Sequence, residues 1–139
     1  MINWDECRTK RLVKETRADL KVIASLINES KKKLATDKYS PLNKVTASTK
    51  ITNNYDSLRE VLEAVALSRG FKIYNHECFV GFLKEIVHLE EEAEMFNRFR
   101  KIRNGINYYG QNISVKEGKF LIKDILKLRR RLMGVLNEK

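Results

Sequence analysis

The sequence predicts an all-α protein, an up-and-down antiparallel bundle of about five helices formed by a single domain over residues 1–139. Apolar residues recur at spacings of three and four over long stretches, as they do along one face of a helix. Capping residues stand where those stretches begin and end. Only one proline and six glycines occur in the chain, fewer than the tight turns of an all-β fold normally need.

The first predicted helix covers residues 5–34. Asn3 and Glu6 have the spacing of a capping box at its start. Its apolar stripe repeats every seven residues at Val13, Leu20, Ile27 and Leu34, with Ile23 beside them. The cations 31–33 lie near its end, where they complement the helix dipole, and we favour this role over ligand binding. Pro41 then ends the helical stretch.

The second and third predicted helices lie in the middle of the chain. Residues 43–68 place Ile51, Tyr55, Leu58, Leu62 and Val65 on one face, and Gly70 is expected at the left-handed position after the helix. A short third helix follows from Asn75, which is expected to cap it. Its apolar face is formed by Phe79, Phe82, Leu83 and Ile86.

The fourth and fifth predicted helices complete the bundle. Residues 90–108 begin with three consecutive glutamates, which favour the positive end of a helix, and Gly110 is expected to end the segment. Ser114 and Glu117 form a second capping box. The helix after it is amphipathic, with buried positions expected at Leu121, Ile125, Leu128, Leu132 and Val135.

The net charge of +10 is unevenly distributed along the sequence. Residues 51–97 carry nine acidic and four basic side chains, whereas residues 98–113 carry four basic side chains and no acidic one. A basic surface apart from an acidic region suits a polyanion such as RNA. A basic protein without such a ligand is the alternative, and charge alone does not separate the two.

The sequence gives little support to several other classes of protein. Cys7 and Cys78 lack metal-ligand spacing, so we expect reduced, packed thiols. His76 and His88 have no cysteine cluster beside them, so neither a metal nor another cofactor is expected. No apolar run approaches the roughly 20 residues of a membrane span, and no leader sequence is evident, so we expect a cytoplasmic protein without membrane contact.

The segment 98–110 carries the strongest functional signal. Arg103 is one residue, about 100°, from Ile102 and therefore lies at the edge of the buried face, where a guanidinium can hold a phosphate or carboxylate. Asn107 lies four residues on and can orient that group. Asn104, Gly105 and Asn107 are poor helix formers, which indicates either a site that sacrifices stability or a fraying helix end.

This segment resembles the characteristic motif of the HEPN superfamily, in which an Arg, often followed by Asn, precedes a His after a short spacer. Here Arg103 and Asn104 are followed after three residues by Tyr108. Residues 58–64 and 70–77, which end in His76 and Glu77, also resemble the corresponding helix, loop and His-Glu pair. The resemblance extends over roughly residues 50–136.

The resemblance implies a helical bundle that commonly dimerises. Many members of the superfamily are metal-independent endoribonucleases, and others are companions of a minimal nucleotidyltransferase, often in toxin–antitoxin pairs. It implies a site with Arg103, Asn104 and Tyr108 at its centre. Arg100, Lys101, Asn107 and His76 would bind nucleotide or RNA around them.

Tyr108 stands where the superfamily motif has histidine, and this favours binding over cleavage. A tyrosine with its ordinary pKa of about 10 is a poor general base near neutral pH. Arg103 and Tyr108 are also about 140° apart on an ideal helix, so they converge only through a distortion at Gly105 or across a dimer. His76 is the alternative proton-transfer residue, although a local contact at the start of its helix would also explain it.

We therefore expect a HEPN-like domain that binds nucleotide or RNA, beside a nucleotidyltransferase partner in a toxin–antitoxin pair. The alternatives are a divergent metal-independent endoribonuclease and a bundle that only binds other proteins. A homodimer is expected because the last helix has a second apolar row, although a helix buried on most sides would have one too. That row is formed by Ile122, Leu126, Met133 and Leu136.

Overall fold

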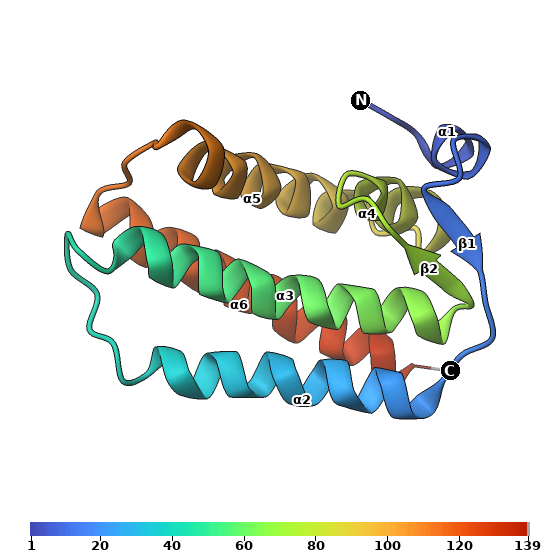
Figure 1. Ribbon diagram of the computed structural model, residues 1–139, viewed down its shortest axis with the longest axis horizontal. Coiled ribbons are helices and arrows are strands. Elements are labelled where there is room, and N and C mark those ends of the chain that lie inside the picture. The colour runs from blue at the N-terminus through green and yellow to red at the C-terminus, as the bar shows by residue number, and fades with distance from the viewer. Residues whose placement is uncertain (139) are drawn as a thin grey trace.

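A computed structural model describes residues 1–138 and shows an all-α fold with one small sheet (Figure 1). Four long helices run up and down: α2 (Leu20–Asp37), α3 (Ala47–Ser68), α5 (Glu90–Tyr109) and α6 (Val115–Asn137). The short helix α1 (Trp4–Thr9), the strands β1 (Val13–Glu15) and β2 (Phe71–Ile73), and α4 (Cys78–Gly81) close one end. A π-helical turn, η1 (Phe82–Ile86), leads from α4 towards α5. The predicted all-α bundle is thus confirmed.

Local sequence signals explain where most of these elements begin and end. Asn3 caps α1 by accepting a hydrogen bond from Glu6 N at 2.8 Å. Ser114 caps α6 in the same way through Glu117 N, while its own hydroxyl donates to the Glu117 carboxylate at 2.9 Å. Gly70 and Gly110 adopt the left-handed φ values of 90° and 62° that end α3 and α5. These caps and ends agree with the sequence-based expectations.

The single helix predicted over residues 5–34 is wrong. Arg11 has a left-handed φ of 58°, which interrupts the helix, and residues 13–15 form β1. This strand pairs antiparallel with β2, with Val13 opposite Ile73. The helix restarts at α2, where Asp19 caps it by accepting from Lys21 N and Val22 N. The seven-residue stripe is therefore not one face, and Leu20 is 78% exposed.

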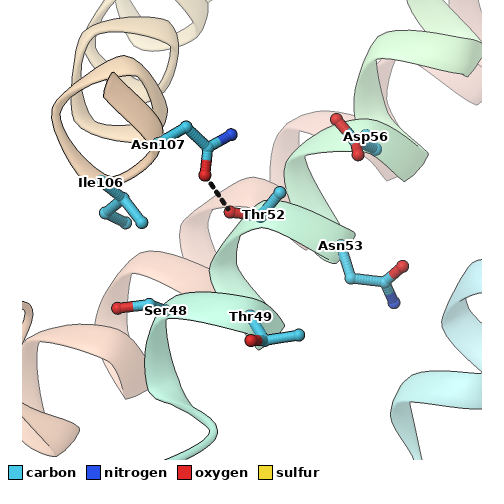
Figure 2. A pocket seen from close by; sticks show the side chains of 7 residues that line it. All are labelled: Ser48, Thr49, Thr52, Asn53, Asp56, Ile106 and Asn107. Carbon is cyan, nitrogen blue, oxygen red and sulfur yellow. Dashed lines mark hydrogen bonds between the residues drawn. The ribbon is translucent and has the colours of Figure 1, made fainter. Parts of the chain in front are cut away.

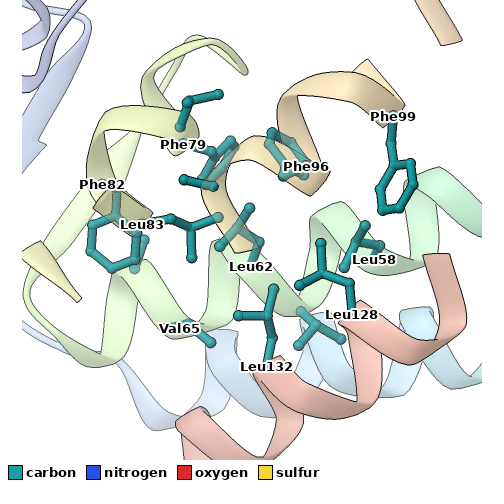
Figure 3. Close-up of a cluster of buried hydrophobic side chains, with 14 of the residues drawn as sticks. Leu58, Leu62, Val65, Phe79, Phe82, Leu83, Phe96, Phe99, Leu128 and Leu132 are labelled. Carbon is teal, nitrogen blue, oxygen red and sulfur yellow. The ribbon is translucent and has the colours of Figure 1, made fainter. Parts of the chain in front are cut away.

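The hydrophobic core lies around α3, which α2, α5 and α6 surround (Figure 3). Leu58, Leu62 and Val65 of α3 face the phenylalanines of the opposite elements. Those aromatic side chains are Phe79, Phe82, Phe96 and Phe99, and all four are almost fully buried. Leu128 and Leu132 of α6 close the other side of this cluster. Burying a large side chain of this kind contributes about 1.5–3 kcal/mol, so the core fixes α5 against α3.

The second apolar row of α6 is accounted for within one chain. Ile122, Met133 and Leu136 are partly buried and pack against the core, and Leu126 is also only partly exposed. The observation that led to the dimer expectation therefore has an explanation that needs no second copy.

Helix α2 attaches to the bundle through polar contacts as well as through partly buried apolar side chains such as Ile27. Its only fully buried residue is Ser30, whose hydroxyl donates to the Ser57 carbonyl oxygen at 2.7 Å. Arg129 Nε of α6 lies 3.0 Å from Ser30 Oγ and 3.1 Å from Ser57 Oγ and donates to them. Burial lowers the pKa of Arg129, because desolvation disfavours its charged form. One guanidinium thus joins three helices.

No helix among residues 1–138 has both the length and the hydropathy to cross a bilayer. Within the same residues, no group of three or more His, Cys, Asp and Glu side chains could hold a metal ion.

The expectation of reduced thiols is wrong, because Cys7 of α1 and Cys78 of α4 form a disulfide. Both residues are completely buried. Isolated spacing in the sequence led to the error, since the bond joins cysteines 71 residues apart that only the fold brings together. Disulfides are typical of oxidising compartments, so the cysteines no longer support the cytoplasmic expectation.

We expect reduction of this disulfide to destabilise the protein. A bond that closes a loop of this length restricts the unfolded chain, and its loss typically costs about 2–5 kcal/mol. Urea unfolding with and without dithiothreitol measures the difference, with Cys7→Ser in the same buffers as the control that should not respond. Two free thiols in the unreduced, denatured protein would contradict the assignment.

Candidate functional site

The face of α5 that meets α3 carries three of the predicted site residues. The three are Arg103 together with Arg100 and Asn107, which lie within about 60° of it around the helix. Lys101 and Tyr108 point away from that face. Helix α5 continues without interruption through Gly105 to Tyr109, so no distortion brings Tyr108 to Arg103. Tyr108 is 69% exposed. Asn104 is partly buried about 100° from Arg103, and Lys101 is exposed.

Arg103 lies in a mostly buried environment between α5 and α3. Its guanidinium carbon is 5.6 Å from the centre of the Tyr55 ring, a cation–π distance. Its Nη2 is 3.8 Å from Asp56 Oδ1, a charge contact too long for a hydrogen bond. The Nε of Arg103 is buried and has no hydrogen-bond partner among residues 1–138. The structure thus pairs Arg103 with Asp56 rather than with Glu63 or another glutamate.

A second arginine, Arg59 of α3, shares this arrangement. Its Nη1 donates to Glu63 at 3.2 Å, and Lys72 of β2 contacts the same carboxylate. The Arg59 Nε is also buried without a partner. A buried polar hydrogen without an acceptor costs about 1–3 kcal/mol. Two such groups in one region indicate a place where acceptor atoms of a ligand would be favourable.

Tyr55 and His76 form the centre around which these arginines gather. Tyr55 Oη is 3.5 Å from His76 Nδ1, and Tyr55 also stacks on Phe96 with ring centroids 5.6 Å apart. Burial, together with the positive charges of Arg59, Arg103 and Arg100, lowers the pKa of His76 to about 4, while Glu63 opposes this shift. Burial also raises the pKa of Tyr55, and the same three arginines oppose that rise.

His76 is therefore a neutral imidazole at physiological pH, held between a phenol and three guanidinium charges. Asn75 accepts a hydrogen bond from Glu77 N at 2.8 Å, which shapes the turn that presents His76. Arg100 is itself held by Asn97, whose side-chain oxygen accepts from Arg100 Nη2 at 2.9 Å. The sequence singled out His76, Arg100 and Arg103, and the structure brings them together.

A polar pocket of about 310 Å³ opens beside this cluster between α3 and α5 (Figure 2). Asn107 of α5 points across it to Thr52 of α3, with 3.4 Å between the amide oxygen and the hydroxyl. Most of its lining residues carry a hydroxyl or amide group, namely Ser48, Thr49, Thr52, Asn53 and Asn107, and Ile106 is the apolar one. Asp56 lines the pocket and lies 3.8 Å from Arg103, so the pocket adjoins the arginine cluster, although none of the three arginines lines it.

Sequence reasoning missed Tyr55, Asp56 and Arg59 as site residues. Tyr55 was assigned to the apolar face of its helix, and nothing local marks Asp56 or Arg59. The spacing of Asp56 and Arg59 does carry a signal, because they share one face of the helix with Thr52. Only the packing of α3 on α5 shows that this face meets Arg103.

Comparison with protein-family models finds no match for this chain, and a search of curated proteins finds none either.

We expect His76 to stay neutral down to a pH of about 4 in the folded protein. The unfolded chain binds a proton at this residue below its ordinary pKa of about 6.5, whereas the folded chain does not. The free energy of unfolding should therefore fall as the pH is lowered from about 6.5 towards 4. This part of the pH dependence should be absent from His76→Gln.

The imidazole signals in an NMR titration measure the pKa directly, and urea unfolding at several pH values measures the linked stability. A His76 midpoint near 6.5 would contradict the described burial.

Proposed function

We propose that this chain is a HEPN-like helical domain that binds nucleotide or RNA at the cluster of Arg59, Arg100 and Arg103. The observation that carries the proposal is the pair of buried Nε groups on Arg59 and Arg103 that have no partner, beside a neutral histidine. Guanidinium groups are well suited to phosphate oxygens, which would supply the missing acceptors. The adjoining polar pocket would hold the sugar or base next to the phosphate.

Arg103→Ala should weaken binding of a labelled single-stranded RNA by about tenfold or more. A hydrogen bond to a charged group contributes about 1.5–3 kcal/mol, and 1.4 kcal/mol corresponds to a factor of ten. Fluorescence anisotropy measures the affinity, and thermal unfolding of the same sample measures stability. Because Asp56 is partly exposed and 3.8 Å away, we expect only a small loss of stability.

Lys31→Ala is the matched control, because Lys31 is exposed on α2. Lys32 and Lys33 are less suitable, since they pair with Glu29 and Glu60. Equal affinities of Arg103→Ala and the unaltered protein would refute the proposed site. A large loss of stability, with binding in proportion to the folded fraction, would assign Arg103 a structural role instead.

An endoribonuclease is the second candidate. The position of His76 favours proton transfer by this residue over proton transfer by Tyr108. A neutral imidazole can accept the proton of a ribose 2′-hydroxyl, while Arg103 would stabilise the charge on the phosphate. Cleavage in the presence of a metal chelator, leaving a cyclic phosphate and lost in His76→Ala, would support this activity. Binding without cleavage would leave the chain a binding domain.

The partner expectations belong to the same proposal. A nucleotidyltransferase encoded beside this chain, copurifying with it, would support a role in a toxin–antitoxin pair. The homodimer stays a prediction that sedimentation decides. A bundle that only binds proteins is the remaining alternative, and salt-dependent RNA binding would argue against it.

A further inference from the structure

The outer face of α6 has a composition that the bundle does not require. Phe120 is 57% exposed there. Lys116, Lys123 and Lys127 lie four residues before it and three and seven residues after it, so they share its face of the helix. Isolated apolar side chains are common on protein surfaces. Phe120 combines an exposed ring with cations along one side of it, while Glu117 and Asp124 lie about 60° and 40° from it on the other side. The ring and the cations favour the same kind of ligand.

The cations of this face are available to a ligand. Among residues 1–138, no carboxylate lies within ion-pair distance of Lys116, Lys119, Lys123, Lys127 or Arg130. The two nearest acidic side chains in sequence are engaged elsewhere. Glu117 accepts from Ser114, and Asp124 pairs with Arg98 at 3.3 Å. From Lys116 to Lys127 the free charges follow the helix for about 16 Å.

An apolar groove adjoins Phe120 where α6 meets α5. It has a volume of about 260 Å³, its apolar wall is formed by Ile102, Ile113, Phe120 and Leu121, and its lining is completed by the charged side chains of Arg98, Glu117 and Asp124. Tyr109 lies seven residues after Ile102 on the same side of α5, and it is 85% exposed. Arg98 and Ile102 lie about 140° and 100° from Arg103 around α5, and the groove shares no lining residue with the pocket beside the arginine cluster.

Exposed aromatic rings along a row of cations bind single-stranded nucleic acid, because bases stack on the rings while phosphates contact the cations. A duplex offers its phosphates but keeps its bases paired. An anionic membrane requires a helix with an apolar face free to enter the lipid. The apolar face of α6 is not free, since Leu121, Ile125, Leu128 and Leu132 are buried in the core. The surface therefore favours a single strand.

We propose that the outer face of α6, with Phe120 at its centre and Tyr109 at its edge, binds single-stranded nucleic acid. Lys116, Lys123 and Lys127 hold phosphates, and Phe120 stacks on a base. Recognition by stacking does not depend on the sugar or on the base sequence, so DNA and RNA strands both bind. A strand bound to this surface continues from the phosphate held at Arg103, or it binds to this surface alone.

The test compares two labelled strands of about 12 nucleotides, oligothymidylate and an abasic strand with the same phosphates. Phe120→Ala should weaken oligothymidylate binding between about fivefold and a hundredfold, and it should leave binding of the abasic strand unchanged. Phe120→Tyr, which keeps the ring, should retain affinity. Lys123→Ala should weaken both strands and reduce the salt dependence by about 0.7 in the logarithmic slope.

Tyr74→Ala is the matched control, because Tyr74 is an exposed tyrosine at the opposite end of the bundle, just after β2. Phe120→Ala binding oligothymidylate as tightly as the unaltered protein would overturn the inference, and so would binding of anionic vesicles in place of either strand. Loss of binding in Arg103→Ala alone would leave the arginine site standing and reject this one; loss in Phe120→Ala alone would do the reverse.

Discussion

The burial of α3 is the constraint on which the rest of the structure depends. Fourteen of its 22 residues are buried, including several polar ones, and α2, α5 and α6 all pack against it. A helix enclosed in this way must satisfy its polar side chains internally, because an unpaired buried group is costly. Ser57 does so through Ser30 and Arg129. Tyr55 instead faces His76 and Arg103, so the same burial that forms the core also creates the candidate site.

Polar and apolar packing divide the bundle into two parts. The phenylalanines of α4, η1 and α5 pack against the site side of α3 and so position the helix that carries Arg100 and Arg103. Helix α2 on the other side depends on hydrogen bonds and on the ion pairs Lys33–Glu60 and Lys50–Asp37. Rigid positioning is what a ligand site needs, since preorganised donors lose less entropy on binding.

Much of the fold could be predicted because its signals are local. The caps at Asn3 and Ser114 and the left-handed ends at Gly70 and Gly110 depend only on neighbouring residues. The break at Arg11 could not be predicted in this way, because β1 forms only when β2 is beside it. Asp19 is of a residue type that favours the start of a helix, but the apparent seven-residue stripe favoured one continuous helix across it. The disulfide likewise needs the fold to bring distant cysteines together.

The candidate site was predicted in part, because helix periodicity is also a local signal. Helix periodicity placed Arg103 and Asn107 at the edge of a buried face, and the structure shows both beside the polar pocket. The same periodicity separated Tyr108 from Arg103, as the uninterrupted α5 shows. The contribution of α3 depends on which helices pack together, and side-chain spacing within one helix does not contain that information.

The most direct measurement of the central claim observes the two buried Nε–H groups themselves. Their NMR resonances can be followed in the intact protein while inorganic phosphate or a short RNA strand is added, with Arg103→Lys and Arg59→Lys identifying each signal. The Arg59 and Arg103 signals should shift together and saturably, because the ligand supplies the acceptor that both lack. Unchanged Nε–H signals at ligand concentrations that saturate binding elsewhere on the protein would contradict the proposed phosphate site.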